Sequence, residues 1–226
     1  MTRVSPLAGL AVAAAVLLTG CGAVPDLNPG IAVVVGDDSV TTRHVADLSS
    51  DYCDAAAPQL EGQALPRHYL NGRVAGSIAL RSAADQMMAE HGVEVDSSYA
   101  AAVKQAEAQL TDLTTAQRDA IVEVQGAETY VAAAETSVGK ATLSKQGESS
   151  PSADDAKAAG QKEFEAWLDD HDVRIDPRYG VAIEKGQAVL TDTSLSQPVT
   201  STAKQADATT PDSTYAAALP TAQRCG

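Results

Sequence analysis

The chain has 226 residues, of which 44% are hydrophobic and only 4% aromatic, and its 16 basic and 30 acidic residues give a net charge of −14. Such a charge repels both a nucleic-acid duplex and anionic lipid head groups, which argues against nucleic acid as a partner and against direct binding to a membrane surface. The Ala-rich composition, with one Phe and one Trp, indicates a helical domain whose core is built from small side chains.

The N-terminus has the pattern of a bacterial lipoprotein signal peptide. One cation, Arg3, precedes an apolar run over residues 7–18, and Leu18-Thr19-Gly20-Cys21 is the kind of motif that marks a cysteine for lipid attachment. The apolar run is too short to span a bilayer. We therefore predict cleavage of residues 1–20, a lipid anchor at Cys21 and a location at the extracytoplasmic face of the cell membrane. The alternative is an ordinary secretory signal with a chance cysteine.

Signal cleavage would leave a body that depends on its lipid for membrane attachment. Residues 1–20 contain one arginine and no acid, so the mature chain has a net charge of about −15. Two acyl chains of the kind expected on Cys21 are enough for stable anchoring.

Two other cysteines, Cys53 and Cys225, remain in the mature chain. Because disulfides are permitted outside the cytoplasm, we expect the two to pair; two free thiols are the alternative. The bridge would close a loop of roughly 170 residues, for which chain entropy gives on the order of 5 kcal/mol of stabilisation. The histidines are scattered and no Cys-x-x-Cys occurs, so no metal site and no cofactor are predicted.

The body begins after a short tether. Residues 21–30 contain two prolines and no periodicity, which is typical of a linker. Ile31 to Val35 is a β-branched run that predicts a buried strand, followed by a tight turn and a short returning strand over residues 36–40. Thr41 or Thr42 then caps a first helix that ends near Cys53, with a loop expected over residues 54–65.

Helical periodicity predicts four further helices, which makes about five in all. The fourth of the five helices is expected to continue as far as Val138, and the Ser- and Gly-rich residues 139–151 are expected to form either a mobile loop or the tip where this helix turns back. The N-terminal signals of the four further helices are, in chain order, a proline, an Asp cap, a Thr-x-x-Gln capping box and a Ser cap. These residues are Pro66, Asp96, Thr114 and Ser152.

A second strand is expected at Val173 to Ile175, where apolar residues alternate with Arg174. We predict that the region 173–176 pairs with residues 31–35, so that the two ends of the domain are joined in a mainly α fold with one small two-stranded β pairing. The domain is expected to cover residues 31–195. Residues 196–226 are polar, and the sequence predicts an unstructured tail held only by Cys225.

Two motifs in these strands carry a family resemblance. Residues 32–41, Ala-Val-Val-Val-Gly-Asp-Asp-Ser-Val-Thr, open a helix, and residues 173–180, Val-Arg-Ile-Asp-Pro-Arg-Tyr-Gly, follow the last one. Together they resemble the SurA-type N-terminal domain of actinobacterial lipoproteins, which is similar to the peptide-binding parts of the SurA and PrsA foldases and of trigger factor. The resemblance implies a helical cradle that binds unfolded or exported polypeptides.

The chain departs from the full foldases, because no stretch has the mixed strand and helix pattern of a parvulin prolyl isomerase domain. It also lacks a Gly-x-Ser-x-Gly motif and a Gly-rich phosphate loop, so we expect a non-catalytic binding protein and no enzyme. The alternative is an envelope scaffold or a small-ligand-binding lipoprotein.

Binding to varied clients needs adaptable apolar side chains. Flexible and aromatic residues at helical spacing are candidates for such contacts, although residues with this spacing are more often core residues. The candidates are Met87, Met88, Tyr99, Tyr130 and Trp167.

Overall fold

The computed structural model describes residues 30–191, 197–206, 208 and 210–226. Within these ranges the chain is mainly helical, as expected, but it forms eight α-helices and seven short strands rather than five helices and one strand pair. The helices are α1 (Thr42–Ala56), α2 (Arg67–His91), α3 (Ser97–Glu107), α4 (Thr115–Gln125), α5 (Ala127–Lys145), α6 (Ala153–Asp170), α7 (Ser201–Ala206) and α8 (Ser213–Ala218). The strands are β1 (Ile31–Val35), β2 (Asp38–Thr41), β3 (Leu65–Pro66), β4 (Val173–Ile175), β5 (Val181–Glu184), β6 (Gln187–Leu190) and β7 (Arg224–Cys225). No helix in these ranges is both long and apolar enough to cross a bilayer.

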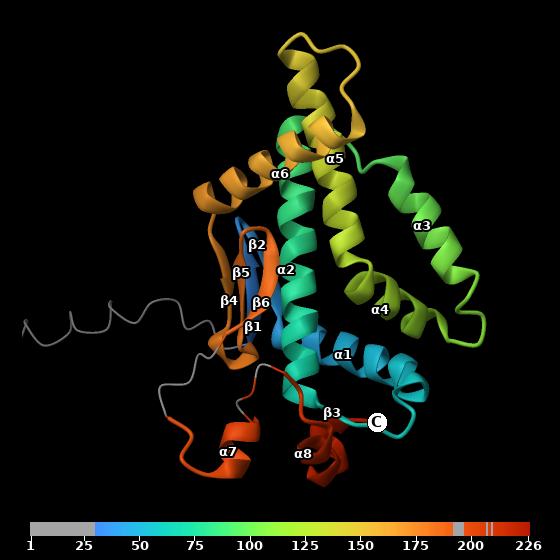
Figure 1. Ribbon diagram of the computed structural model, residues 1–226, viewed down its shortest axis with the longest axis vertical. Coiled ribbons are helices and arrows are strands. Elements are labelled where there is room, and N and C mark those ends of the chain that lie inside the picture. Colours follow the sequence, from blue (N-terminus) through green and yellow to red (C-terminus); the bar gives the residue numbers. More distant parts are fainter. Residues whose placement is uncertain (1–29, 192–196, 207, 209) are drawn as a thin grey trace, which may run out of the picture.

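Helix α2 is the centre of the molecule, with a layer of strands on one side and α5 alongside it (Figure 1). Pro66 stands at its N-terminus, and Gly92 ends it in the left-handed conformation at φ 67°. Small and medium apolar residues around α2 are fully buried, among them Val74, Ala79 and Met87. A helix that is apolar on several faces is suited to this central position.

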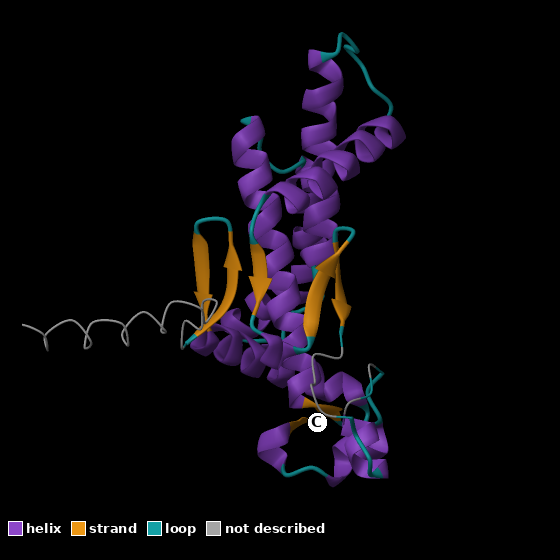
Figure 2. Cartoon of the chain, turned by 90° about the vertical axis from the view of Figure 1, so that its left-hand side faces the viewer, coloured by secondary structure: helices purple, strands orange, loops and turns teal. Residues whose placement is uncertain are grey.

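The predicted pairing of the two ends of the domain is confirmed. Strand β1 pairs antiparallel with both β2 and β4, in the order β2-β1-β4, with Val33 opposite Ile175. The strands lie in one layer along the helices (Figure 2). Gln86 on α2 donates a hydrogen bond to the Val35 carbonyl at 2.8 Å, which ties the sheet to the central helix.

The Asp-Pro-Arg-Tyr-Gly segment forms a short 3₁₀ helix, η2 (Pro177–Tyr179), directly after β4. Asp176 caps it through the Arg178 amide and forms an ion pair with the Arg178 side chain at 2.9 Å. Tyr179 is buried, and its carbonyl lies against α2. This motif therefore has a structural role, because it turns the chain from β4 onto the central helix.

The hairpin of β5 and β6 follows and was not predicted. Its two-residue turn, Lys185 and Gly186, has positive φ at both positions (49° and 72°), as tight hairpins require. Gly76 on α2 makes room for the hairpin, since a Cβ there would lie 2.7 Å from the Ala188 Cβ, and Gly72 makes room for η2 just before it, since a Cβ there would lie 2.5 Å from the Tyr179 carbonyl oxygen. The hairpin therefore lies directly on the backbone of the central helix.

The expected fourth helix is two helices. The chain bends at Gly126, so that α4 packs on α1 while α5 packs on α2. The predicted start of the loop at Gly139 is also wrong, because α5 continues to Lys145 and only residues 146–152 separate it from α6. A Cβ at Gly139 would lie 1.8 Å from the Ala156 carbonyl oxygen of α6, so this glycine allows two helix backbones to touch and does not mark a turn.

Two further expectations are corrected near the termini. Helix α1 continues to Ala56 and is followed by a 3₁₀ helix, η1 (Ala57–Leu60), where a loop was expected. The C-terminal region, expected to be unstructured, contains α7 and α8, a 3₁₀ helix, η3 (Thr221–Gln223), and β7, which pairs with β3. Cys53 and Cys225 form the expected disulfide, with Cα atoms 5.6 Å apart, and Cys225 is fully buried.

Candidate functional site: a groove beside the β5–β6 hairpin

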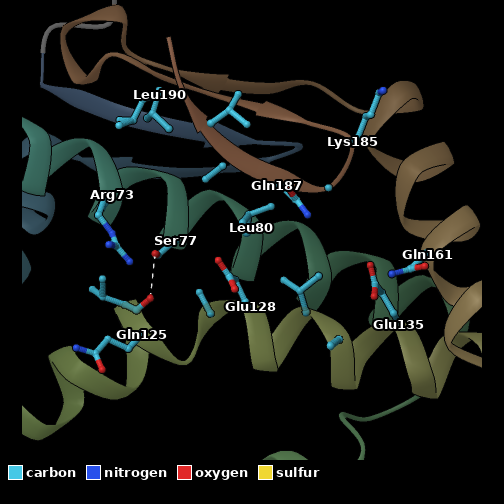
Figure 3. A pocket seen from close by; sticks show the side chains of 18 of the residues that line it. Arg73, Ser77, Leu80, Gln125, Glu128, Glu135, Gln161, Lys185, Gln187 and Leu190 are labelled. Carbon is cyan, nitrogen blue, oxygen red and sulfur yellow. Dashed lines mark hydrogen bonds between the residues drawn. The ribbon is translucent and has the colours of Figure 1, made fainter. Parts of the chain in front are cut away.

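An open groove lies between the β5–β6 hairpin and the helices α2, α5 and α6, and α4 borders one end (Figure 3). Its volume is about 970 Å³, at the upper end of the range for ligand pockets. Strand β6 forms one wall along its whole length, and α5 supplies another through Glu128, Val131, Ala132 and Glu135. The spacing of these four residues places them on one face of the helix.

The groove is lined by polar and apolar side chains together. Leu80, Val131 and Leu190 contribute apolar surface, and three glutamines, Gln125, Gln161 and Gln187, contribute amides. Three cations and three carboxylates also line it: Arg73, Lys157, Lys185, Glu128, Glu135 and Glu165. Such a surface offers hydrogen bonds and both signs of charge, which suits a ligand that is itself polar along its length and apolar at intervals.

Ser77 connects two of the helices that line the groove, α2 and α4. Its hydroxyl donates a hydrogen bond of 3.2 Å to the Val124 carbonyl of α4, near the bend at Gly126 (Figure 3). This bond links the central helix to the last turn of α4.

Glu135 is the most unusual ionisable group in the groove. Only 8% of the residue is exposed, because α6 passes so close that a Cβ at Gly160 would lie 1.8 Å from the Glu135 carbonyl oxygen. Burial raises the pKa of Glu135 to about 7, an effect that the Lys157 ammonium opposes and the Glu165 carboxylate reinforces. Glu135 and Gln161 point toward one another at the α6 end of the groove (Figure 3). Glu135 is therefore able to change its charge close to neutral pH.

The residues predicted to contact clients lie outside this groove. Met87, Met88 and Trp167 are core residues, with exposed fractions of 0%, 5% and 5%. The Trp167 indole donates a hydrogen bond of 2.9 Å to Glu90 and stacks on the His171 ring, with the ring centres 4.0 Å apart. These contacts fix Trp167 within the fold.

Tyr99 and Tyr130 are half-buried, at the contact between α3 and α5. Their rings meet edge to face, with centres 4.9 Å apart, and the Arg81 guanidinium lies 4.2 Å from the centre of the Tyr130 ring. Arg81 also donates a hydrogen bond of 2.8 Å to the Tyr99 hydroxyl, while the Tyr130 hydroxyl donates to Asp85. Burial and the bond to Asp85 raise the pKa of Tyr130. The two tyrosines therefore attach α3 to the body.

Cys21, the lipidation candidate, lies outside the described residues. Within the described ranges no three His, Cys, Asp or Glu side chains are grouped so that they could hold a metal ion.

Comparison with known proteins does not place the chain in a family. Neither a family model, nor a curated protein, nor a solved structure matches it.

Proposed function

We propose that this chain is a lipid-anchored lipoprotein at the extracytoplasmic face of the cell membrane that binds unfolded or exported polypeptides without catalysing a reaction. The groove beside β6 is the observation that supports the proposal best. It is open rather than enclosed, and it combines apolar side chains with amides and charges of both signs. A polypeptide segment carries the same combination, with a polar main chain and side chains of varied character.

The resemblance of the strand motifs to SurA-type N-terminal domains supports the same proposal. In this structure, however, the helical candidates for client contact are largely core residues, so the proposed binding surface is the groove. Aggregation of a chemically unfolded client, followed by light scattering with stoichiometric amounts of the body from Gly22 onward, tests the activity.

A pair of bulky substitutions on α5 tests the location. Ala132 lines the groove, whereas Thr129 is exposed on the same helix and does not line it. Ala132→Trp should fill the groove and abolish most of the suppression of aggregation, and Thr129→Trp should leave it intact. If neither variant, or both, lost activity while circular dichroism showed them folded, the groove would not be the binding site. If the unaltered body suppressed no aggregation, a scaffold or small-ligand role would replace the proposal.

The anchor is tested separately. Detergent phase partitioning should place the full-length protein with the membrane lipids and a Cys21→Ser variant in the aqueous phase. Equal partitioning of the two would contradict the lipid anchor and leave the groove proposal untouched.

A further inference from the structure

Among the described residues, strand β6 has one unpaired hydrogen-bonding edge. Its sheet has two strands, so β5 is its only paired neighbour in the described part of the chain. The Thr191 amide donates to the Gly180 carbonyl at 2.9 Å, which fixes the alternation of the ladder. Since residues of an antiparallel strand alternately face the partner and face away, Gln187 and Val189 bond to β5. The N–H and C=O groups of Ala188 and Leu190 therefore point to the unpaired side.

This edge lacks three of the features that normally prevent pairing with another chain, namely charge, proline and a bulge. Exposed edges are usually protected by charged side chains, proline or bulges. Strand β6 has the sequence Gln-Ala-Val-Leu, without a charge or a proline, and it pairs with β5 without a register shift. Ala188 is exposed even though its Cβ lies against Gly76 of α2, so solvent reaches the strand's main chain.

The opposite wall is suited to the side chains of an added strand. The groove residues of α5 extend from Glu128 to Glu135, about 10 Å along the helix, which corresponds to about three extended residues. Val131 and Ala132 lie between the two carboxylates, and Leu80 of α2 lines the same groove. Small apolar side chains at alternate positions would meet this surface, and basic ones would meet Glu128 at its end.

We propose that the groove binds an extended, neutral or basic polypeptide segment as a new strand beside β6, with hydrogen bonds from the Ala188 and Leu190 main chain. This inference rests on the proposed function and specifies how it works. A main-chain mode of binding explains how one site serves many sequences, because every extended segment offers the same alternating donors and acceptors. The net charge of the mature protein, about −15, favours basic segments through electrostatic attraction.

Backbone methylation of a probe peptide tests this mode. The probe is a fluorescent octapeptide, Lys-Val-Thr-Val-Thr-Val-Thr-Lys, titrated with the body from Gly22 onward and followed by anisotropy. One version carries N-methyl groups on the valines, another on the threonines. Because only alternate amides of an added strand face β6, one methylated version should bind at least tenfold more weakly and the other within twofold of the parent. Equal affinity of all three peptides would overturn the strand-addition mode.

A protein variant provides a second test. Ala188→Pro removes an N–H that points to the free side and no ladder bond to β5, while Ala188→Ser keeps that N–H. The proline variant should raise the Kd at least tenfold and the serine variant less than twofold, with both folded by circular dichroism. If the proline variant does not fold, the methylated peptides decide alone. If neither N-methylation of the peptide nor Ala188→Pro weakens binding, strand addition is overturned but the proposed function is not. Absence of binding to any peptide or unfolded client overturns both.

Discussion

Glu135 makes the stability of the protein depend on pH. Its pKa of about 7 lies above the ordinary glutamate value of 4.5, so the folded state binds a proton more tightly than the unfolded state. Stability from this group is therefore fully present below about pH 4.5 and is lost as the pH rises to about 7.

Substitution of Glu135 by glutamine should remove this dependence. We expect Glu135→Gln to be more stable than the unaltered protein by roughly 1 kcal/mol at pH 8, a value reduced for the water that reaches the groove, and equally stable near pH 4. Urea unfolding at the two pH values measures the difference. A variant that is less stable at pH 8 would show that the neighbours of the Glu135 carboxylate stabilise its charged form more than burial destabilises it.

Residues whose roles are local were predictable, and those whose roles depend on distant contacts were not. Thr41, Thr114 and Ser152 cap their helices as expected, because capping needs only residues a few positions away. Glu135 carries no such signal, since its burial comes from α6, which is distant in the sequence. Met87 and Trp167 illustrate the same limit, because helical spacing does not distinguish a core side chain from a binding one.

At the scale of elements, the crossing of α5 and α6 depends on glycine. In an ordinary helix Gly→Ala stabilises by about 1 kcal/mol, but a methyl group at Gly139 would overlap the Ala156 carbonyl of α6. We expect Gly139→Ala to destabilise the fold by about 2–3 kcal/mol in urea unfolding. Thr129→Ala, at an exposed position of the same helix, is the control and should change stability by less than about 0.5 kcal/mol. Unaltered stability of Gly139→Ala would mean that the two helices are not in contact.

Helix α3 is the least firmly packed of the long helices. None of its side chains, all of which are described, is buried. Its N-cap Asp96 accepts a hydrogen bond of 2.7 Å from Lys140 of α5, and this bond, with that from the Ser98 amide, lowers the pKa of Asp96 to about 2. Tyr99 and Tyr130 provide the other main attachment.

Removal of the Asp96–Lys140 ion pair should loosen α3 locally and leave the rest of the fold in place. Lys140→Gln should speed hydrogen exchange of the amides of residues 97–107, while the stability of the whole protein falls by less than about 1 kcal/mol. Amides in the middle of α2 serve as the internal control. Unchanged protection of α3 would show that the tyrosine contacts hold the helix by themselves.

Among the elements, the sequence indicated the strand pairing and most helix starts but not the hairpin. Lys185-Gly186 between short apolar segments is a usable turn signal, yet each strand has only four residues and the hairpin packs on Gly76, which is far away in the sequence, in α2. The roles of Gly126 and Gly139 were missed for a related reason, since the predicted fourth helix ran through Gly126 and the predicted loop began at Gly139. One marks a bend between packed helices and the other a close contact, and both meanings exist only in three dimensions.

At the scale of the whole molecule, the disulfide connects the first helix of the domain to the C-terminal end of the chain. Cys225 follows Arg224 in β7, which pairs with β3 ahead of α2, while Cys53 lies in α1. Reduction should lower the free energy of unfolding by about 5 kcal/mol, because the bridge joins residues 172 positions apart. Urea unfolding with and without reductant measures this, and a Cys53→Ala/Cys225→Ala variant should show no further effect of reductant. A midpoint that reductant does not move would mean that the bridge contributes nothing to stability.

Site-specific photocrosslinking tests the central claim, that clients bind in the groove beside β6. A photoreactive phenylalanine derivative is placed at Gln187 on the hairpin or, as the control, at Lys104 on α3, and each protein is irradiated with an unfolded client. Our account predicts a crosslink from position 187 that Ala132→Trp abolishes, and none from position 104. Crosslinking from α3 without crosslinking from the hairpin would contradict the account and place the binding surface on the tyrosine side of the molecule.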